Sequence, residues 1–335
     1  MRRCILGIAA LYLSACGEPT QGVVSQAYMS LQGTQLQGVQ LQGPVADMTM
    51  VGFQFAGATL NGAALTNLRV EGGQLVAERN QTTLRGEALR DAHLLAQVRD
   101  IDANPPTSAT VEYRITAIEP EDAELYDPTG TGSTFLYTLE QNVGGPDPWR
   151  SACNIDNDGR HAAIPLTAIW NEHGDRVESS TLFTLGCTTG VIAKCYRWGY
   201  RPWVTGHGNL ATMHWTCTRM ARADYCGNGR SHTRDGTVIN FWDNADPGPI
   251  RARGSTPLLM LFEAGWSTDG AVCLSHARWL LAGPILALGC PNRLIAPGLL
   301  ILNATVCDTT AQVLGQSSHA RMFDECNLHL NLDLF

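Results

Sequence analysis

The sequence predicts a protein of mixed fold, in which a short right-handed quadrilateral β-helix precedes a disulfide-rich α+β domain. Three observations predict it. Apolar residues recur at every fifth position over residues 31–97, strand-like and helix-like patterns follow over residues 98–335, and the cysteines concentrate in that second part. The chain has 335 residues, of which 44% are hydrophobic and 16% charged. That length and composition exclude a wholly disordered chain and suffice to bury a core.

Residues 1–15 are typical of a bacterial lipoprotein signal peptide. Arg2 and Arg3 precede the apolar stretch Ile5 to Leu13, which is too short to cross a bilayer. Leu13-Ser14-Ala15-Cys16 follows and resembles a lipobox, which implies cleavage before Cys16 and lipid attachment to its thiol. An ordinary secretory signal with an incidental cysteine is the alternative.

Residues 16–30 are expected to form a tether between that lipid and the folded protein. The residue after Cys16 is Gly17 rather than the Asp that retains lipoproteins on the inner membrane of enterobacteria. This favours the outer membrane as the place of anchoring.

Residues 31–97 carry the five-residue period, which is neither the 3.6 of a helix nor the 2 of a strand. The pattern resembles the pentapeptide repeat, whose apolar residues point into a square coil, and its length predicts about three coils. A Gly/Gln-rich linker with chance leucines is the alternative. The positions expected to point inward are Leu31, Leu36, Leu41, Val45, Met50, Phe55, Leu60, Leu65, Val70, Leu75, Leu84, Leu89 and Leu94.

Residues 98–335 are expected to form the α+β domain. Alternating apolar and β-branched residues predict strands over 109–119 and 133–143, and a further pair within 162–187 that turns at 172–175. One short helix is expected to start at Thr188 or Thr189. A longer one is expected after Asn209, which can cap it. Further helices are predicted near 256–264, 271–282 and 309–325.

Cysteines of the exported chain predict disulfides rather than a zinc site, because no C-x2-C pair occurs. An odd number leaves at least one thiol unpaired. Cys217 and Cys226 are nine residues apart, about 13 Å along a helix axis, so we expect each to pair with a distant cysteine. The candidates for disulfides are Cys153, Cys187, Cys195, Cys217, Cys226, Cys273, Cys290, Cys307 and Cys326.

Residues 222–243 form the densest polar cluster and are the candidate site for chemistry. Asp224, His232 and Asp235 are candidates for an acid–base set, with Arg230 or Arg234 binding an anion. In the structural alternative, Asp224 pairs with Arg219 or Arg222, and Asp235-Gly236 is a turn.

Three weaker hypotheses concern a metal site, a cysteine nucleophile and an aromatic groove. His207, His214 and His232 are candidates for metal ligands, although His214 lies on a helical core face. The leftover thiol is a candidate nucleophile. Tyr196, Trp198, Tyr200 and Trp203 either line a groove or pack in the core, and the core is favoured. No metal or cofactor is expected.

Several blocks of the second part resemble the ADYC domain family, seen mainly in myxobacterial and related secreted or lipidated proteins. Ala223-Asp224-Tyr225-Cys226 is the signature that names the family. CTTGVIAKCYRWGYRPW over 187–203, SHTRDGT over 231–237 and FEAGWSTDGAVC over 262–273 are also similar to it. The resemblance runs from about residue 110 to the end and implies no activity.

These features together indicate a lipid-anchored cell-envelope protein that serves as a surface binding or structural module, with a protein or a glycan as its ligand. We expect the protein to attach to a membrane through its lipid anchor. A net charge of −8 gives no electrostatic basis for binding nucleic acid. The alternative is an envelope hydrolase with its site around residues 222–243.

Overall fold

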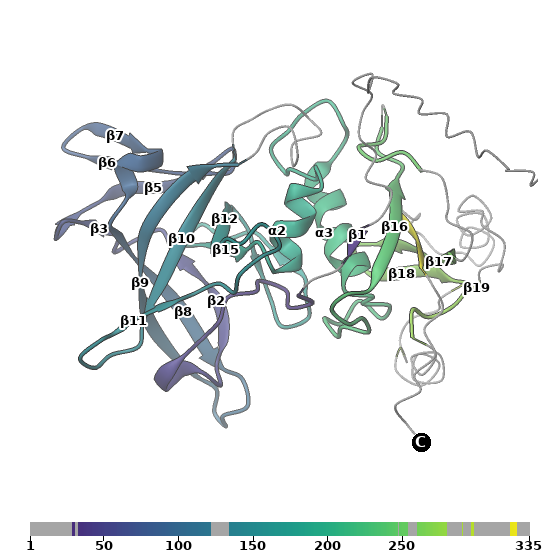
Figure 1. Ribbon diagram of the computed structural model, residues 1–335, viewed down its shortest axis with the longest axis horizontal. Coiled ribbons are helices and arrows are strands. Elements are labelled where there is room, and N and C mark those ends of the chain that lie inside the picture. The colour runs from purple at the N-terminus through teal and green to yellow at the C-terminus, as the bar shows by residue number, and fades with distance from the viewer. Residues whose placement is uncertain are drawn as a thin grey trace, which may run out of the picture.

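The computed structural model describes residues 33–121, 134–246, 248–253, 260–279, 290 and 322–326, together with two short strands at 29–30 and 296–297. Its described part is mostly antiparallel β-structure with two short α-helices (Figure 1). The signal peptide over 1–15, Cys16, most of the tether and Cys307 lie outside the described residues. Among those described, no helix is long and apolar enough to span a membrane.

Six strands close into a barrel, because β2 pairs with β8 on one side and with β15 on the other. Every pairing in the ring is antiparallel. In ring order the strands are β2 (Thr49–Gln54), β8 (Ala92–Asp100), β9 (Thr107–Pro120), β10 (Phe135–Asn142), β12 (Ala162–Leu166) and β15 (Leu182–Cys187).

Aromatic side chains from three of these strands fill the barrel. Phe53 packs edge-on against Tyr113, with ring centroids 5.0 Å apart, and lies 5.8 Å from Phe183. All three are fully buried. Along β8 buried and more exposed residues alternate, as expected when a strand presents one face to the interior.

Shorter elements decorate the barrel. β11 (Trp149–Ser151) pairs antiparallel with the end of β10, and β3 (Thr59–Leu60), which forms a hairpin with β4 (Ala63–Ala64), pairs with β8. A separate three-stranded sheet comprises β5 (Thr66–Glu71), β6 (Gln74–Arg79) and β7 (Thr82–Arg85). The remaining elements are the hairpin β13 (Ile169–Trp170) with β14 (Arg176–Val177) and the 3-10 turns η1 (Gly43–Val45) and η2 (Gly86–Leu89).

A second sheet of six strands lies across the two helices from the barrel (Figure 1). Its order is β1 (Met29–Ser30), β16 (Val238–Asp243), β20 (Met322–Cys326), β17 (Leu261–Ser267), β18 (Gly270–Leu274) and β19 (Ala296–Pro297). The helices are α2 (Val191–Arg197) and α3 (Leu210–Ala221). Met213, Cys217 and Met220 of α3 pack with Trp266 of the sheet in one core.

The predicted β-helix is wrong. Leu31 lies outside the described residues. The other twelve positions are at least partly buried, but they lie in hairpins, barrel strands, 3-10 turns and an irregular segment rather than in a coil. A spacing of five residues also separates the second pair of cross-strand partners on either side of a two-residue hairpin turn. Val70 pairs with Leu75 around Gly72-Gly73, and Asn61-Gly62, with φ of 51° and 73°, turns the hairpin before Leu65.

The predicted α+β character of residues 98–335 is also wrong, because the regular secondary structure described in this part is mostly strand as well. Residues 261–267, 270–274 and 322–326 form β17, β18 and β20, where helices near 256–264, 271–282 and 309–325 were expected. These strands are buried almost throughout, so they lack the alternation that reveals a strand with one exposed face. The rest of those three ranges is only partly described.

Other expectations for this part are confirmed. Strands occupy 109–119 within β9, most of 133–143 as β10, and both ends of 162–187. The longer helix begins after Asn209, whose side chain accepts a hydrogen bond from the Thr212 N–H at 3.1 Å. The shorter helix forms too, but Gly190 rather than Thr188 or Thr189 is its N-cap.

Candidate functional site

Three disulfides link the described part of the chain. Cys153 pairs with Cys187, Cys195 with Cys217 and Cys226 with Cys290, at Cα–Cα distances of 5.5, 5.8 and 5.2 Å. Cys217 and Cys226 therefore pair with other cysteines, as predicted. Cys273 is also disulfide-bonded.

Cys326 is the free cysteine among the described residues, and it is buried. Burial, with the neighbouring Glu263 carboxylate, raises the pKa of its thiol. Its Sγ lies 3.6 Å from Nε2 of His276, so one histidine is in contact with it. A thiol that is buried and held in its protonated form is nevertheless a weak nucleophile, so burial disfavours the cysteine-nucleophile hypothesis.

The Asp224 carboxylate of the signature is buried, at 1% exposure, and its oxygens are occupied. It accepts hydrogen bonds from the Arg219 guanidinium at 2.6 Å and from the N–H groups of Asn228 and Gly229 at 3.1 and 2.8 Å. The same guanidinium pairs with Asp175 and donates to the His173 carbonyl. Asp224 thus fixes the turn after α3.

Tyr225 of the signature joins a buried ionic network. Its hydroxyl donates to Glu263 at 2.7 Å and accepts from the Arg278 N–H at 2.7 Å. The Arg278 guanidinium donates to Glu263 and to Asp324, each at 2.9 Å. Because every partner is fully buried, the network ties the turn after α3 to β17 and β20.

His232 and Asp235 complete the predicted acid–base set, but the structure does not bring the three together. The His232 ring lies against Tyr225, with centroids 5.6 Å apart, and its Nδ1 is 3.1 Å from the Ala223 carbonyl. Burial lowers the pKa of His232. Asp235 is exposed and lines a pocket to which neither Asp224 nor His232 contributes.

His214 and the aromatic candidates have structural roles. His214 is fully buried, its Nε2 is 2.9 Å from the Ile192 carbonyl, and burial lowers its pKa to about 4. Within the described ranges, no three Cys, His, Asp or Glu side chains are grouped to hold a metal ion. Tyr196, Trp198 and Tyr200 are buried and Trp203 is partly buried, which confirms the core assignment.

The pocket that Asp235 lines has a volume of about 320 Å³. It is formed mainly by residues 33–42, which we call the glutamine strap, and by the loop that follows β11. The described lining residues are Gly33, Thr34, Gln35, Gly38, Gln40, Asn154, Ile155, Thr189 and Asp235. Segments far apart in the sequence therefore meet in one polar pocket.

The backbone of the glutamine strap is fixed against the start of α2. The N–H groups of Val191 and Ile192 donate to the carbonyls of Gln35 and Leu36, each at 3.1 Å, and the Cys187 N–H donates to Gln37 at 2.8 Å. The bonds from Val191 and Ile192 satisfy N–H groups of the first helical turn that otherwise lack partners. Gly38 has φ of 72°, and a Cβ there would lie 2.7 Å from the Gly190 nitrogen, so the close approach requires glycine.

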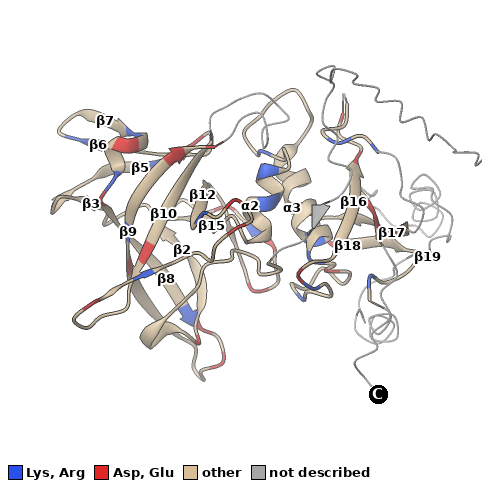
Figure 2. Ribbon diagram, viewed as in Figure 1, with Lys and Arg blue, Asp and Glu red and all other residues tan. Residues whose placement is uncertain are grey.

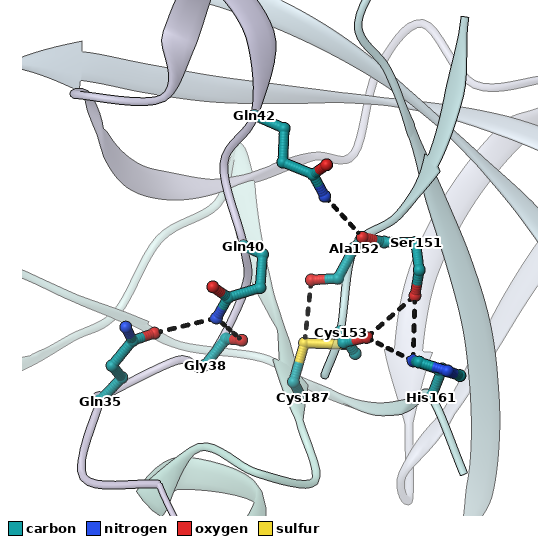
Figure 3. The surroundings of a disulfide bond; sticks show 9 residues. All are labelled: Gln35, Gly38, Gln40, Gln42, Ser151, Ala152, Cys153, His161 and Cys187. Carbon is teal, nitrogen blue, oxygen red and sulfur yellow. Dashed lines mark hydrogen bonds between the residues drawn. A yellow bond between two sulfur atoms is a disulfide. The ribbon is translucent and has the colours of Figure 1, made fainter. Parts of the chain in front are cut away.

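Side chains of the strap hold it to the barrel beside the Cys153–Cys187 disulfide (Figure 3). The Gln42 amide donates to the Ser151 carbonyl at 2.8 Å, and the Gln40 N–H donates to the Ala152 carbonyl at 2.8 Å. The Gln40 side-chain amide contacts Gln35 at 3.2 Å (Figure 3). The strap is thus held in place on both of its sides.

Lys194 of α2 is the only lysine in the chain, and its side chain reaches the beginning of the glutamine strap. Its ammonium donates to the Gly33 carbonyl at 2.6 Å. Burial lowers the pKa of Lys194 to about 8, although the nearby Asp235 carboxylate acts in the opposite direction. The amine therefore positions the strap rather than lining the pocket.

An ionic cluster fixes the loop that carries Asn154 and Ile155. Arg197 of α2 pairs with Glu121 at 2.7 Å and with Asp158 at 3.1 Å. In Figure 2 the basic residues of α2 and α3 stand at the junction of the barrel and the second sheet, with acidic residues on loops beside them. The pocket wall therefore rests on buried ion pairs.

Sequence reasoning missed Gln35, Gln40, Asn154 and Thr189 as lining residues. Amides and hydroxyls carry no signature when they are scattered along a chain, and the leucines of the strap drew attention instead. The repeated Gln-Gly pairs over 32–43 were the available signal, since a glutamine-rich segment with turn-forming glycines is suited to display amides.

The fold and disulfides define an antiparallel β protein in which a closed barrel and a six-stranded sheet flank two short helices. Within that class, the family model of the ADYC domain matches residues 86–280, more than half of the chain, and the protein belongs to the ADYC domain family. The matched range includes Asn154, Thr189 and Asp235 but not the strap. No curated protein and no solved structure matches the chain.

Proposed function

We propose that the protein is a lipid-anchored module of the cell envelope that binds a ligand in the pocket under the glutamine strap. One observation carries the proposal: six polar side chains from four segments converge there, on a backbone fixed by hydrogen bonds and a disulfide. Ligand pockets span about 300–1,000 Å³, and this one is at the lower end.

Binding is better supported than hydrolysis by the positions of the candidate residues. A hydrolytic site needs an acid and a base that face a shared space. Asp224 is engaged with Arg219 and two backbone N–H groups, whereas Asp235 is the one carboxylate among the described lining residues. The pocket therefore has groups for recognition, but its described lining has no second titratable side chain that could act with Asp235 as an acid–base pair.

Anchoring through Cys16, with the outer membrane as its location, belongs to the same proposal. It rests on Leu13-Ser14-Ala15-Cys16 after the apolar stretch. Cys16→Ser is expected to abolish fatty-acid labelling and to move the protein from the membrane to the soluble fraction. A variant that still labels and still sediments with membranes would contradict the anchor.

Binding is tested with detergent-solubilised full-length protein and envelope fragments of the source organism. We expect saturable binding that falls at least ten-fold in Asp235→Asn and in Asn154→Ala. The matched control is Asp102→Asn, which removes an exposed carboxylate at the end of the barrel strand β8. Equal binding by all four proteins would remove the pocket from the proposal.

A further inference from the structure

We infer that the pocket binds a neutral saccharide unit, an inference that rests on the proposed function and names the ligand class for its pocket. A saccharide offers hydroxyls that both donate and accept hydrogen bonds, an uncharged surface, and faces of C–H groups. The pocket matches each of these three properties in the described residues.

The lining presents donors and acceptors together. Gln35 accepts from the Gln40 amide, which also donates to the Gly38 carbonyl at 3.1 Å. This leaves the Gln35 amide N–H groups and the Gln40 carbonyl oxygen without a partner in the described part of the chain. The Thr189 hydroxyl oxygen is buried and likewise has no partner there. This oxygen has almost no accessible surface, so the groups presented to a ligand are the amides of Gln35 and Gln40.

Asn154 and Asp235, which come from two other segments of the chain, add an amide and a carboxylate to the lining. Neither side chain makes a hydrogen bond to another described residue. A carboxylate has two acceptor oxygens, so it can take two neighbouring hydroxyls at once, and an amide can donate to one hydroxyl and accept from another. This set suits adjacent hydroxyls better than it suits an apolar ligand.

The charge of the lining selects against anions. Asp235 is the one charged side chain among the described lining residues, and no Lys or Arg is among them. The Lys194 ammonium is directed to the Gly33 carbonyl. A phosphate, sulfate or carboxylate ligand would meet the Asp235 carboxylate, while the nearby Lys194 ammonium, which is not among the described lining residues, is already engaged with a backbone carbonyl. The neutral class of saccharide therefore fits best.

Ile155 supplies the apolar part of the lining. Ile155 is one of the most exposed large hydrophobic residues described, with 62% of its surface accessible. Asn154 directly follows Cys153, and Thr189 lies two residues after Cys187, so one disulfide fixes both positions. A lining held in place before binding loses less conformational entropy when a weakly interacting ligand arrives.

The test uses an array of neutral, amino and acidic oligosaccharides probed with detergent-solubilised full-length protein, followed by calorimetric titration with the best neutral oligosaccharide. We expect neutral oligosaccharides to bind, and binding to weaken at least ten-fold in Asp235→Asn and Asn154→Ala. Ile155→Ser is expected to weaken it about three-fold, with Ile101→Ser, 48% exposed on the barrel, as its matched control. Each variant is used only if its thermal unfolding matches that of the wild type.

The outcomes separate this inference from the proposed function. Preference for acidic oligosaccharides, or binding to none, would overturn the saccharide. If none binds while envelope binding still depends on Asp235, the pocket has another ligand and the proposed function stands. Loss of that envelope binding after protease treatment of the fragments would identify a protein ligand instead. If envelope binding is also independent of Asp235, both proposals fail.

Discussion

The two polar regions of this molecule, one around the signature and one around the glutamine strap, differ in how far their side chains are paired within the protein. Around the signature, the charged groups of Asp224, Glu263 and Arg278 are buried and paired with one another. Around the glutamine strap, amides, hydroxyls and one carboxylate line a pocket with few internal partners. The denser cluster holds the fold together, and the sparser one is the pocket to which we assign ligand binding.

The difference teaches that charge density along a sequence is a poor guide to which polar side chains lack partners within the fold. A buried charge needs partners to offset its lost hydration, so a protein that folds must supply them from its own chain. An exposed or half-buried amide has no such requirement. The comparison predicts large stability losses in the signature region and small ones in the pocket.

The largest effect is expected for Cys226→Ser, which removes a bridge between residues separated by 64 positions. Closing a loop of that length contributes about 4 kcal/mol through the entropy of the unfolded chain. Denaturant unfolding should show this loss, and peptide mapping should find Cys290 alkylated in the native protein. Cys290→Ser breaks the same bridge from its other end and should lose about as much. A Cys226→Ser variant as stable as the wild type would contradict a stapling role for Cys226.

The second effect concerns Asp224→Asn, which keeps the shape of the side chain and removes its charge. The buried Arg219 guanidinium would retain Asp175 but lose its fully buried partner. Breaking such a pair costs about 3 kcal/mol. Equilibrium denaturation measures it, with Asp102→Asn again as the exposed control. A loss below about 1 kcal/mol would show that Asp224 is not an anchor of the fold.

The third effect is a pH dependence from Lys194. Its pKa is about 8 in the folded protein, below the usual value of 10.5, because burial disfavours the charged form. Between these values the unfolded chain binds more protons, so stability rises with pH, by about 2 kcal/mol. Below pH 8 the cost of the buried charge is present in full.

Lys194→Met should remove that rise, which a comparison of unfolding free energies at pH 7 and pH 10 measures. Because the chain has one lysine, ¹³C-methylation of its amine gives a single lysine signal whose titration can be followed directly. A titration midpoint near 10.5 would contradict the burial of the Lys194 amine.

Part of this architecture could be predicted from the sequence, and the reasons differ by element. Asn209 and the stripe from Leu210 to Met220 gave the longer helix, because capping and periodicity are local. The barrel depends on pairing β2 with both β8 and β15, and no local pattern encodes which strands meet. The five-residue period was real, but the pairing of Val70 with Leu75 explains it without a coil.

The candidate site was less predictable than the fold, for a physical reason. Asp224 and Asp235 have the same side chain in one segment, and only their surroundings distinguish an anchor from a pocket residue. Those surroundings come from distant positions, namely Arg219 for the first and the glutamine strap for the second. The cysteine pairings of Cys217 and Cys226 were predictable as distant ones because the rise of a helix sets a minimum separation.

The smallest effect expected is that of Asp235→Asn, and it sharpens the comparison most directly. The substitution is the same as in Asp224→Asn and falls in the same segment, but Asp235 is exposed and makes no hydrogen bond to another described residue. Substitutions at exposed positions without such partners usually change stability by less than about 0.5 kcal/mol. Loss of this carboxylate removes its attraction for the Lys194 ammonium, so the pKa of that amine should fall slightly below 8. Denaturant unfolding of the two Asp→Asn variants in parallel measures the contrast, and the ¹³C signal of Lys194 reports the local effect. If Asp235→Asn destabilises the protein as much as Asp224→Asn does, the pocket carboxylate is part of the structural framework, and the distinction between the two regions does not hold.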